Sequence, residues 1–163
     1  MKNIGELDAS GYGIMVFSPE KFNQFLKDRK CRARKYLDYF DKHREVFFDL
    51  IRAGILLSFY RICKIEYEIF VTVNETEIII PSTYEQVYCY TDFFVRVGNG
   101  KLCFSNFEFF NAHKEMIEWY NYFIGLDLES GEYQFDLYGL KRIEPLKRES
   151  KNVCLEKSRK YNQ

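Results

Sequence analysis

Few residues of this 163-residue chain have the types and spacing that nucleophilic catalysis requires. Cys103 lies ten residues before His113, and a thiolate nucleophile needs a neighbouring base of this kind. Cysteine is also a common buried residue of strands, so the surrounding pattern favours a structural role for Cys103. We therefore expect no catalytic residues, and an enzyme remains an alternative rather than the main interpretation.

Acidic side chains form the second group with chemical potential. Glu66 and Glu68 share one face of a predicted strand, and Glu75 and Glu77 follow closely. Paired carboxylates act as general acid and base when a second strand brings a partner within reach. A solvent-facing strand surface also has to be polar, and this interpretation is favoured.

Motifs for metals and phosphate cofactors are not found in the sequence. Zinc sites use closely spaced pairs of Cys or His, and the chain has neither Cys-x-x-Cys nor His-x₃-His. The glycine pairs Gly11-Tyr12-Gly13 and Gly98-Asn99-Gly100 do not match a phosphate loop or a dinucleotide fingerprint. We expect no metal and no cofactor.

Basic residues are concentrated in two stretches of a chain whose net charge is zero. The stretches 27–44 and 141–163 each carry eight Lys or Arg against three Asp or Glu, which leaves an acidic body. The run 27–35 could bind nucleic acid, an acidic membrane surface or an acidic protein, or it could be the solvated end of a helix. The zero net charge argues against a dedicated nucleic-acid or membrane binder. The candidate anion-binding residues are Lys27, Arg29, Lys30, Arg32, Arg34 and Lys35.

Aromatic residues are more numerous than one small core requires, with 16 Phe, 13 Tyr and one Trp. Several fall on the strand face opposite the better core residues, so a second layer of the domain or a partner must cover them. Aromatic side chains dominate the binding energy of many protein interfaces. The candidate partner-binding residues are Glu66, Glu68, Phe70, Tyr88, Tyr90 and Phe94.

Hydrophobic periodicity places these residues on secondary structure. A strand is predicted at 12–17, and a helix at 19–30 with Ser18 as its N-cap and a proline in its first turn. A second helical pattern runs from residue 33 to Gly54, and the sequence leaves open whether the two helices are continuous. From residue 55 the period changes to two, which predicts strands at 55–62, 64–73, 76–80, 86–91, 93–97, 101–107, 119–128 and 132–140.

This order of elements predicts an α+β protein that is mainly β. We expect an antiparallel sandwich or a strongly curved sheet with an N-terminal helical segment at about 19–53. Residues 1–143 are expected to form one globular domain, and residues 144–163 a flexible basic tail. The N-terminus lacks the apolar stretch of a signal peptide, and no segment approaches a membrane-spanning helix. With five scattered cysteines, this predicts a cytoplasmic protein with free thiols.

The succession of blocks between residues 47 and 139 resembles a known family. Phe47-Phe48-x-Leu50-Ile51-x-Ala53-Gly54 precedes a strand, and Glu68-Ile-Phe-Val-Thr-Val73, Val95-x-Val-Gly-Asn-Gly-Lys-Leu102 and Leu126-Asp-Leu-Glu-Ser-Gly-Glu-Tyr-Gln-Phe135 follow. This order is similar to small bacterial β-sandwich proteins that include the competence-type nuclease inhibitor and immunity-like relatives. The resemblance implies a bacterial protein that neutralises a toxin or nuclease without catalysis of its own. The helical segment at 19–53 departs from the family pattern.

Three functional hypotheses follow from the sequence. The first is a non-catalytic protein-binding module, an immunity or inhibitor protein whose acidic face meets a basic toxin or nuclease. The second is a small-ligand-binding protein or enzyme with an aromatic-lined pocket. The third is a nucleic-acid binder that uses the run 27–35.

Overall fold

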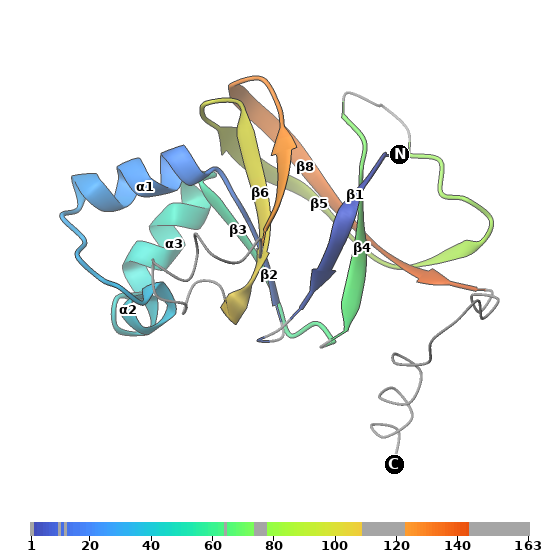
Figure 1. Cartoon of the computed structure of the whole chain (residues 1–163), viewed down its shortest axis with the longest axis horizontal. Helices are drawn as coiled ribbons and strands as arrows, with labels where there is room; N and C mark the ends of the chain where they lie inside the picture. Colours follow the sequence, from blue (N-terminus) through green and yellow to red (C-terminus); the bar gives the residue numbers. More distant parts are fainter. Residues whose placement is uncertain are drawn as a thin grey trace, which may run out of the picture. The chain divides into compact units, whose positions relative to one another are not determined.

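The computed structural model describes residues 2–9, 11, 13–63, 65–73, 78–108 and 123–143. The described part is mainly β with antiparallel pairing and carries three helices, which confirms the predicted α+β class, whereas the sandwich stays a prediction. In chain order the elements are β1 (Lys2–Asp8), β2 (Gly13–Phe17), α1 (Pro19–Asp28), α2 (Tyr36–Lys42), α3 (Arg44–Arg52), β3 (Leu56–Tyr60), β4 (Glu66–Val71), β5 (Tyr84–Val97), β6 (Lys101–Asn106), β7 (Phe123–Asp127) and β8 (Gly131–Arg142) (Figure 1).

The chain divides into two compact units. Unit 1 comprises residues 1–78 and 90–137, and unit 2 comprises residues 79–89 and 138–163. Strands β5 and β8 therefore contribute residues to both units. The expectation of a single domain over residues 1–143 stays a prediction, and the predicted basic tail at 144–163 lies outside the described residues.

A four-stranded antiparallel sheet is the centre of unit 1, with the strand order β3-β2-β6-β7. Its central strand β2 is buried along most of its length, because both faces of the sheet are covered. Successive residues of a strand point to opposite faces, so Met15 and Phe17 contribute to one core and Val16 to another. The short apolar run Ile-Met-Val-Phe is typical of a strand buried on both sides.

The three helices cover one face of this sheet (Figure 1). Phe22 and Leu26 of α1 are buried four residues apart, as are Val46 and Leu50 of α3, so each helix turns one apolar stripe to the sheet. These side chains pack with Phe40 of α2 and with sheet residues to form the first core. The predicted helical segment at 19–53 is thus confirmed, but it consists of three helices that are interrupted at residues 29–35 and at His43.

Ser18 is the N-cap residue of α1, as predicted, but its hydroxyl makes no hydrogen bond to the first turn of the helix. Instead, the buried Ser18 Oγ accepts a hydrogen bond of 2.9 Å from the backbone N–H of Gly98. The side chain therefore ties the start of α1 to the turn that follows β5.

The opposite face of the four-stranded sheet contributes to a second core. Buried residues of this core come from β1, β2, β3, β5 and β6, and partly buried residues of β4, β7 and β8 pack against it. Strand β1 pairs with β4 in antiparallel register, and β5 pairs with β8. In β4 the predicted alternation is confirmed, because Ile69 and Val71 pack on this core whereas Glu66 and Glu68 are exposed.

Two further differences from the expected strands concern short segments. Strand β1 was not predicted, because its pairing with β4 shifts between Asn3 and Gly5 and the bulge breaks the two-residue period. In contrast, the strand predicted at 76–80 is wrong over residues 78–80, which have no regular secondary structure. Residues 76 and 77 of that prediction lie outside the described residues.

Two turns, one between β5 and β6 and one between β7 and β8, connect the β5–β8 pair with the four-stranded sheet. Asn99 and Gly100 both have positive φ angles, of 47° and 68°, which fits the predicted Asn-Gly turn. The backbone N–H of Leu128 donates to Gly100 O at 2.9 Å, and Gly100 N–H donates to Ser130 Oγ at 3.2 Å. The turn between β5 and β6 is therefore bonded to the segment between β7 and β8.

Strand β5 carries an irregularity at Asp92, whose φ of 65° is unusual within a strand. Its backbone N–H donates to Asp136 Oδ1 at 3.0 Å, and its own carboxylate accepts from Gln134 Nε2 at 3.0 Å. After this point the odd-numbered residues of β5 turn to the core, including the buried Val95 and Val97. The irregularity thus changes which face of β5 is apolar.

The described part of unit 2 contains the far ends of β5 and β8. The Tyr88 ring lies directly over Gly139, at a distance that leaves no room for a side chain at position 139. At the end of the ribbon, Arg142 Nη2 donates to Tyr84 Oη at 2.9 Å, and Lys141 Nζ lies 3.1 Å from Glu85 Oε1. Cross-strand pairs of this kind stabilise a two-stranded ribbon.

Candidate functional site

Four exposed carboxylates lie together on the outer face of the β1–β4 pair. The register places Glu6 directly opposite Glu68 and Asp8 directly opposite Glu66. Between these pairs, Leu7 and Tyr67 are opposite each other and point to the other side of the ribbon, where Leu7 is buried. We call Glu6, Asp8, Glu66 and Glu68 the acidic face.

Like charges that face each other across two strands destabilise a sheet. The acidic face contains two such pairs, one after the other along the ribbon. All four side chains are exposed. This arrangement reduces the stability of the ribbon and concentrates negative charge on a surface that solvent and a partner can reach.

Within the described ranges, no group of three or more His, Cys, Asp or Glu side chains is arranged so that it could hold a metal ion. Among the helices that the structure describes, none is long and apolar enough to cross a membrane.

The six residues predicted to bind a partner have different surroundings. Glu66 and Glu68 belong to the acidic face, and Phe70, on the same side of β4, is half-buried opposite Asn3. Tyr90 is 55% exposed, and its ring centroid lies 6.5 Å from that of Phe93.

The other two predicted aromatic residues pack on glycines. In unit 1, a Cβ atom on Gly54 would lie 2.6 Å from the Phe94 ring, so this ring covers the backbone just after α3. In unit 2, Tyr88 covers Gly139 in the same way. Both rings therefore have a packing role in the described structure, and Tyr90 is the more accessible of the predicted aromatic residues.

The basic run at 27–35 begins in the last turn of α1 and continues through the irregular segment 29–35, which we call the basic connector. Arg29 is used by the fold: its Nη2 lies 2.8 Å from Asp49 Oδ2 on α3, and its guanidinium carbon lies 3.8 Å from the centre of the Phe25 ring. Lys35 Nζ lies 4.0 Å from Asp38 Oδ2. The remaining cations of the run, Lys27, Lys30, Arg32 and Arg34, are exposed.

Of the candidate nucleophile pair Cys103 and His113, the structure describes only Cys103. This residue is 2% exposed and belongs to the core between the sheet and the helices. Burial raises the pKa of the Cys103 thiol, which favours the uncharged form and disfavours a nucleophilic thiolate. His113 lies outside the described residues, as do Glu75 and Glu77.

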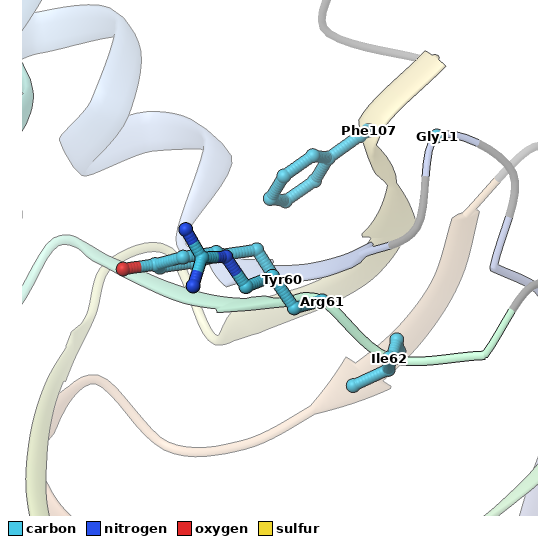
Figure 2. A pocket seen from close by; sticks show the side chains of 5 residues that line it. All are labelled: Gly11, Tyr60, Arg61, Ile62 and Phe107. Carbon is cyan, nitrogen blue, oxygen red and sulfur yellow. The ribbon is translucent and has the colours of Figure 1, made fainter.

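Unit 1 also contains an open hollow of about 470 Å³, lined by Gly11, Tyr60, Arg61, Ile62 and Phe107 (Figure 2). Tyr60 of β3 is opposite Gly13 of β2, and the Phe107 ring lies where a side chain on Gly13 would be, 2.7 Å from the position of its missing Cβ. A Cβ on Gly11 would also lie 2.8 Å from Phe107 Cβ. The two glycines thus allow the ring to lie low over β2.

Comparisons of this chain with protein-family models, with curated proteins and with solved structures found no match. The resemblance to nuclease inhibitors and immunity proteins therefore stays a prediction.

Sequence reasoning missed half of the acidic face and the position of the hollow. Glu6 and Asp8 lie on a strand that was not predicted, so their pairing with Glu68 and Glu66 was not foreseen. The available signal was the spacing Glu-x-Asp at residues 6–8, which repeats the Glu-x-Glu spacing of residues 66–68. The hollow depends on which strand pairs with which, and a single sequence does not contain that information.

Proposed function

We propose that this chain is a non-catalytic protein-binding module, and that the acidic face binds a partner with a basic surface. The observation that supports this proposal is the directly opposed pairing of Glu6 with Glu68 and of Asp8 with Glu66. An arrangement that costs stability and leaves the charge exposed is typical of a surface used for binding, where stability is traded for function.

The expected partner is a basic protein. Complementary potentials across an interface accelerate association and exclude wrong partners more than they add to affinity. A rigid strand pair is a suitable platform, because cross-strand pairing and the Leu7 anchor fix the spacing of the four carboxylates. Tyr90, exposed on β5 of the same unit, supplies an aromatic side chain of the kind that anchors interfaces.

The specific form of the proposal is an inhibitor or immunity protein that neutralises a basic nuclease or toxin. It is supported by the acidic face and by the resemblance of the 47–139 pattern to such bacterial proteins. The nucleic-acid alternative has less support, because Arg29 of the basic run is already paired with Asp49 and stacked on Phe25.

The test compares three forms of the chain as baits in a lysate of the source organism treated with nuclease. The baits are the wild type, the double variant Glu66→Lys/Glu68→Lys, and a control, Asp38→Lys/Asp41→Lys, which makes the same change in charge at exposed positions of α2. Bound proteins are quantified by mass spectrometry. The rate of association of any purified partner is then measured at several salt concentrations.

The proposal is supported if a basic protein is captured by the wild type and the control but lost from the acidic-face variant. Its association rate constant should fall at least about tenfold in the variant and should fall steeply with salt for the wild type. A partner captured equally by all three baits would refute the role of the acidic face. An association rate that is independent of salt would refute the electrostatic basis of the proposal.

A further inference from the structure

The hollow in unit 1 has an unusual backbone at its edge. Arg61 follows the last residue of β3 and has a φ angle of 63°, in the left-handed region that side-chain-bearing residues rarely adopt. Such a conformation is strained for a residue with a side chain, and residues held in it are concentrated at functional sites. Among the described residues, no carboxylate forms an ion pair with Arg61, so an ion pair does not explain this backbone conformation.

The left-handed conformation has a direct effect on where the guanidinium lies. In a regular strand, residues 60 and 61 would project to opposite faces of the sheet. Here the two side chains lie on the same side, with the guanidinium carbon of Arg61 5.9 Å from the centre of the Tyr60 ring (Figure 2). Both side chains line the hollow as a result.

The Phe107 ring lies across the hollow from these two side chains and points towards them (Figure 2). It belongs to the segment that follows β6, and it stays low over the sheet because Gly13 has no side chain beneath it. Tyr60 is 61% exposed, so much of its surface is available to a ligand. The hollow therefore presents two aromatic side chains, one guanidinium and the apolar side chain of Ile62.

These groups select a particular ligand chemistry. Aromatic side chains bind flat apolar bodies by stacking or edge contacts, and a guanidinium binds a carboxylate through two parallel hydrogen bonds. A volume of about 470 Å³ is within the range of small-molecule sites. We infer that the hollow binds a small planar aromatic carboxylate, with its ring between Tyr60 and Phe107 and its carboxylate on Arg61.

The test uses 2-naphthoate as the probe and the full chain labelled with nitrogen-15, followed by two-dimensional amide NMR. Two analogues separate the contributions: 2-naphthamide keeps the ring without the charge, and cyclohexanecarboxylate keeps the charge without a planar ring. The main variant is Arg61→Gly, because glycine adopts a positive φ without strain and the fold is preserved. Arg61→Asn, also tolerant of this conformation, is the second variant, and Arg32→Ala controls for the loss of an exposed arginine elsewhere.

We expect saturable shifts at the amides of Gly11, Gly13, Arg61 and Ile62, with a dissociation constant on the order of 1 mM because the hollow is open to solvent. Arg61→Gly and Arg61→Asn should each weaken binding about tenfold or more, and both analogues should bind about tenfold more weakly than 2-naphthoate. Arg32→Ala should bind 2-naphthoate as the wild type does.

Three results would overturn the inference: no saturable shift, shifts centred away from these amides, or equal binding by the wild type and the Arg61 variants. Tight binding of cyclohexanecarboxylate would overturn the role of the rings. The acidic-face variant Glu66→Lys/Glu68→Lys shares no residue with the hollow and should bind 2-naphthoate normally. The inference and the proposed function can therefore fail separately.

Discussion

Unit 1 carries two strongly charged regions, and the fold treats them differently. In the basic connector, the arginine at its start is held by a carboxylate of α3 and by an aromatic ring, and the lysine at its end lies near Asp38. In the acidic face, each of the four carboxylates has another carboxylate as its cross-strand neighbour. In the basic connector the named cations lie near opposite charges, whereas the register of the acidic face places like charges opposite each other.

This difference indicates where function is to be sought. Charges that the fold pairs with opposite charges have a structural explanation, and their presence in the sequence needs no partner. Like charges that the register brings face to face destabilise the strand pair. The basic run is easily recognised in the sequence because its residues are close together in the chain. The acidic face is not, because it consists of residues about 60 positions apart.

The largest effect on stability within this comparison is expected for Arg29→Ala. The change removes the ion pair with Asp49 and the stacking on Phe25, and should lower the free energy of unfolding by about 1 to 2 kcal/mol after allowance for solvent screening of this half-exposed pair. Urea unfolding of the wild type, Arg29→Ala and Arg29→Lys measures it. If Arg29→Ala lowers the free energy of unfolding by less than about 0.5 kcal/mol, the contacts of Arg29 do not stabilise the fold, and this contrast with the acidic face is lost.

The next effect has the opposite sign. Glu68→Lys places a cation opposite Glu6 and should raise the free energy of unfolding by about 0.2 to 1 kcal/mol, because it replaces a like-charge pair with an opposite-charge pair. Asp41→Lys, on the exposed side of α2, is the control for the same change in net charge. Chemical denaturation at low salt is the measurement, and equal effects of the two substitutions would show that the cross-strand register is unimportant.

A smaller effect is expected from salt on the wild type. Increasing sodium chloride from about 0.01 M to about 0.15 M shortens the screening length from about 30 Å to about 8 Å, which weakens repulsion within the acidic face. The free energy of unfolding should rise by a few tenths of a kcal/mol, and the rise should be smaller in Glu68→Lys. If stability falls with salt in both proteins, attractive pairs elsewhere dominate and the comparison loses its basis.

The smallest effect is expected at the exposed cations of the basic run. Combined replacement of Lys27, Arg32 and Arg34 with alanine should change the free energy of unfolding by less than about 0.5 kcal/mol, since these side chains are exposed and none of the described carboxylates pairs with them. Thermal unfolding followed by circular dichroism provides the measurement. A loss comparable to that of Arg29→Ala would show that these cations also support the fold.

Much of the fold could be predicted from local patterns. The two-residue period of 66–71 and the Asn99-Gly100 turn each depend on neighbouring residues only, and both are present in the structure. Strand β1 escaped prediction because the bulge near Gly5 leaves its two inward apolar residues, Ile4 and Leu7, three positions apart. A three-residue spacing is typical of a helix and conceals a strand.

The candidate site was less predictable, for a physical reason. The acidic face and the hollow both depend on cross-strand neighbours, and pairing partners are set by the whole fold rather than by local sequence. The same limit explains why Phe94 and Tyr88 looked like surplus aromatic residues. These two rings pack on glycines, Gly54 and Gly139, which leave no apolar signature in the sequence.

The hydrogen bonds between the two turns at residues 98–101 and 128–131 have a consequence for local opening. Gly100 donates to Ser130 and accepts from Leu128, so neither turn can lose this contact without the other. Strands β6 and β7, which these turns flank, are also paired along their length. Amide hydrogens of loops usually exchange with solvent far faster than those of strands. At Leu128 and Gly100, amide hydrogen exchange should instead require both turns to open together. The exchange rates of these two loop amides should therefore be close to those of the sheet.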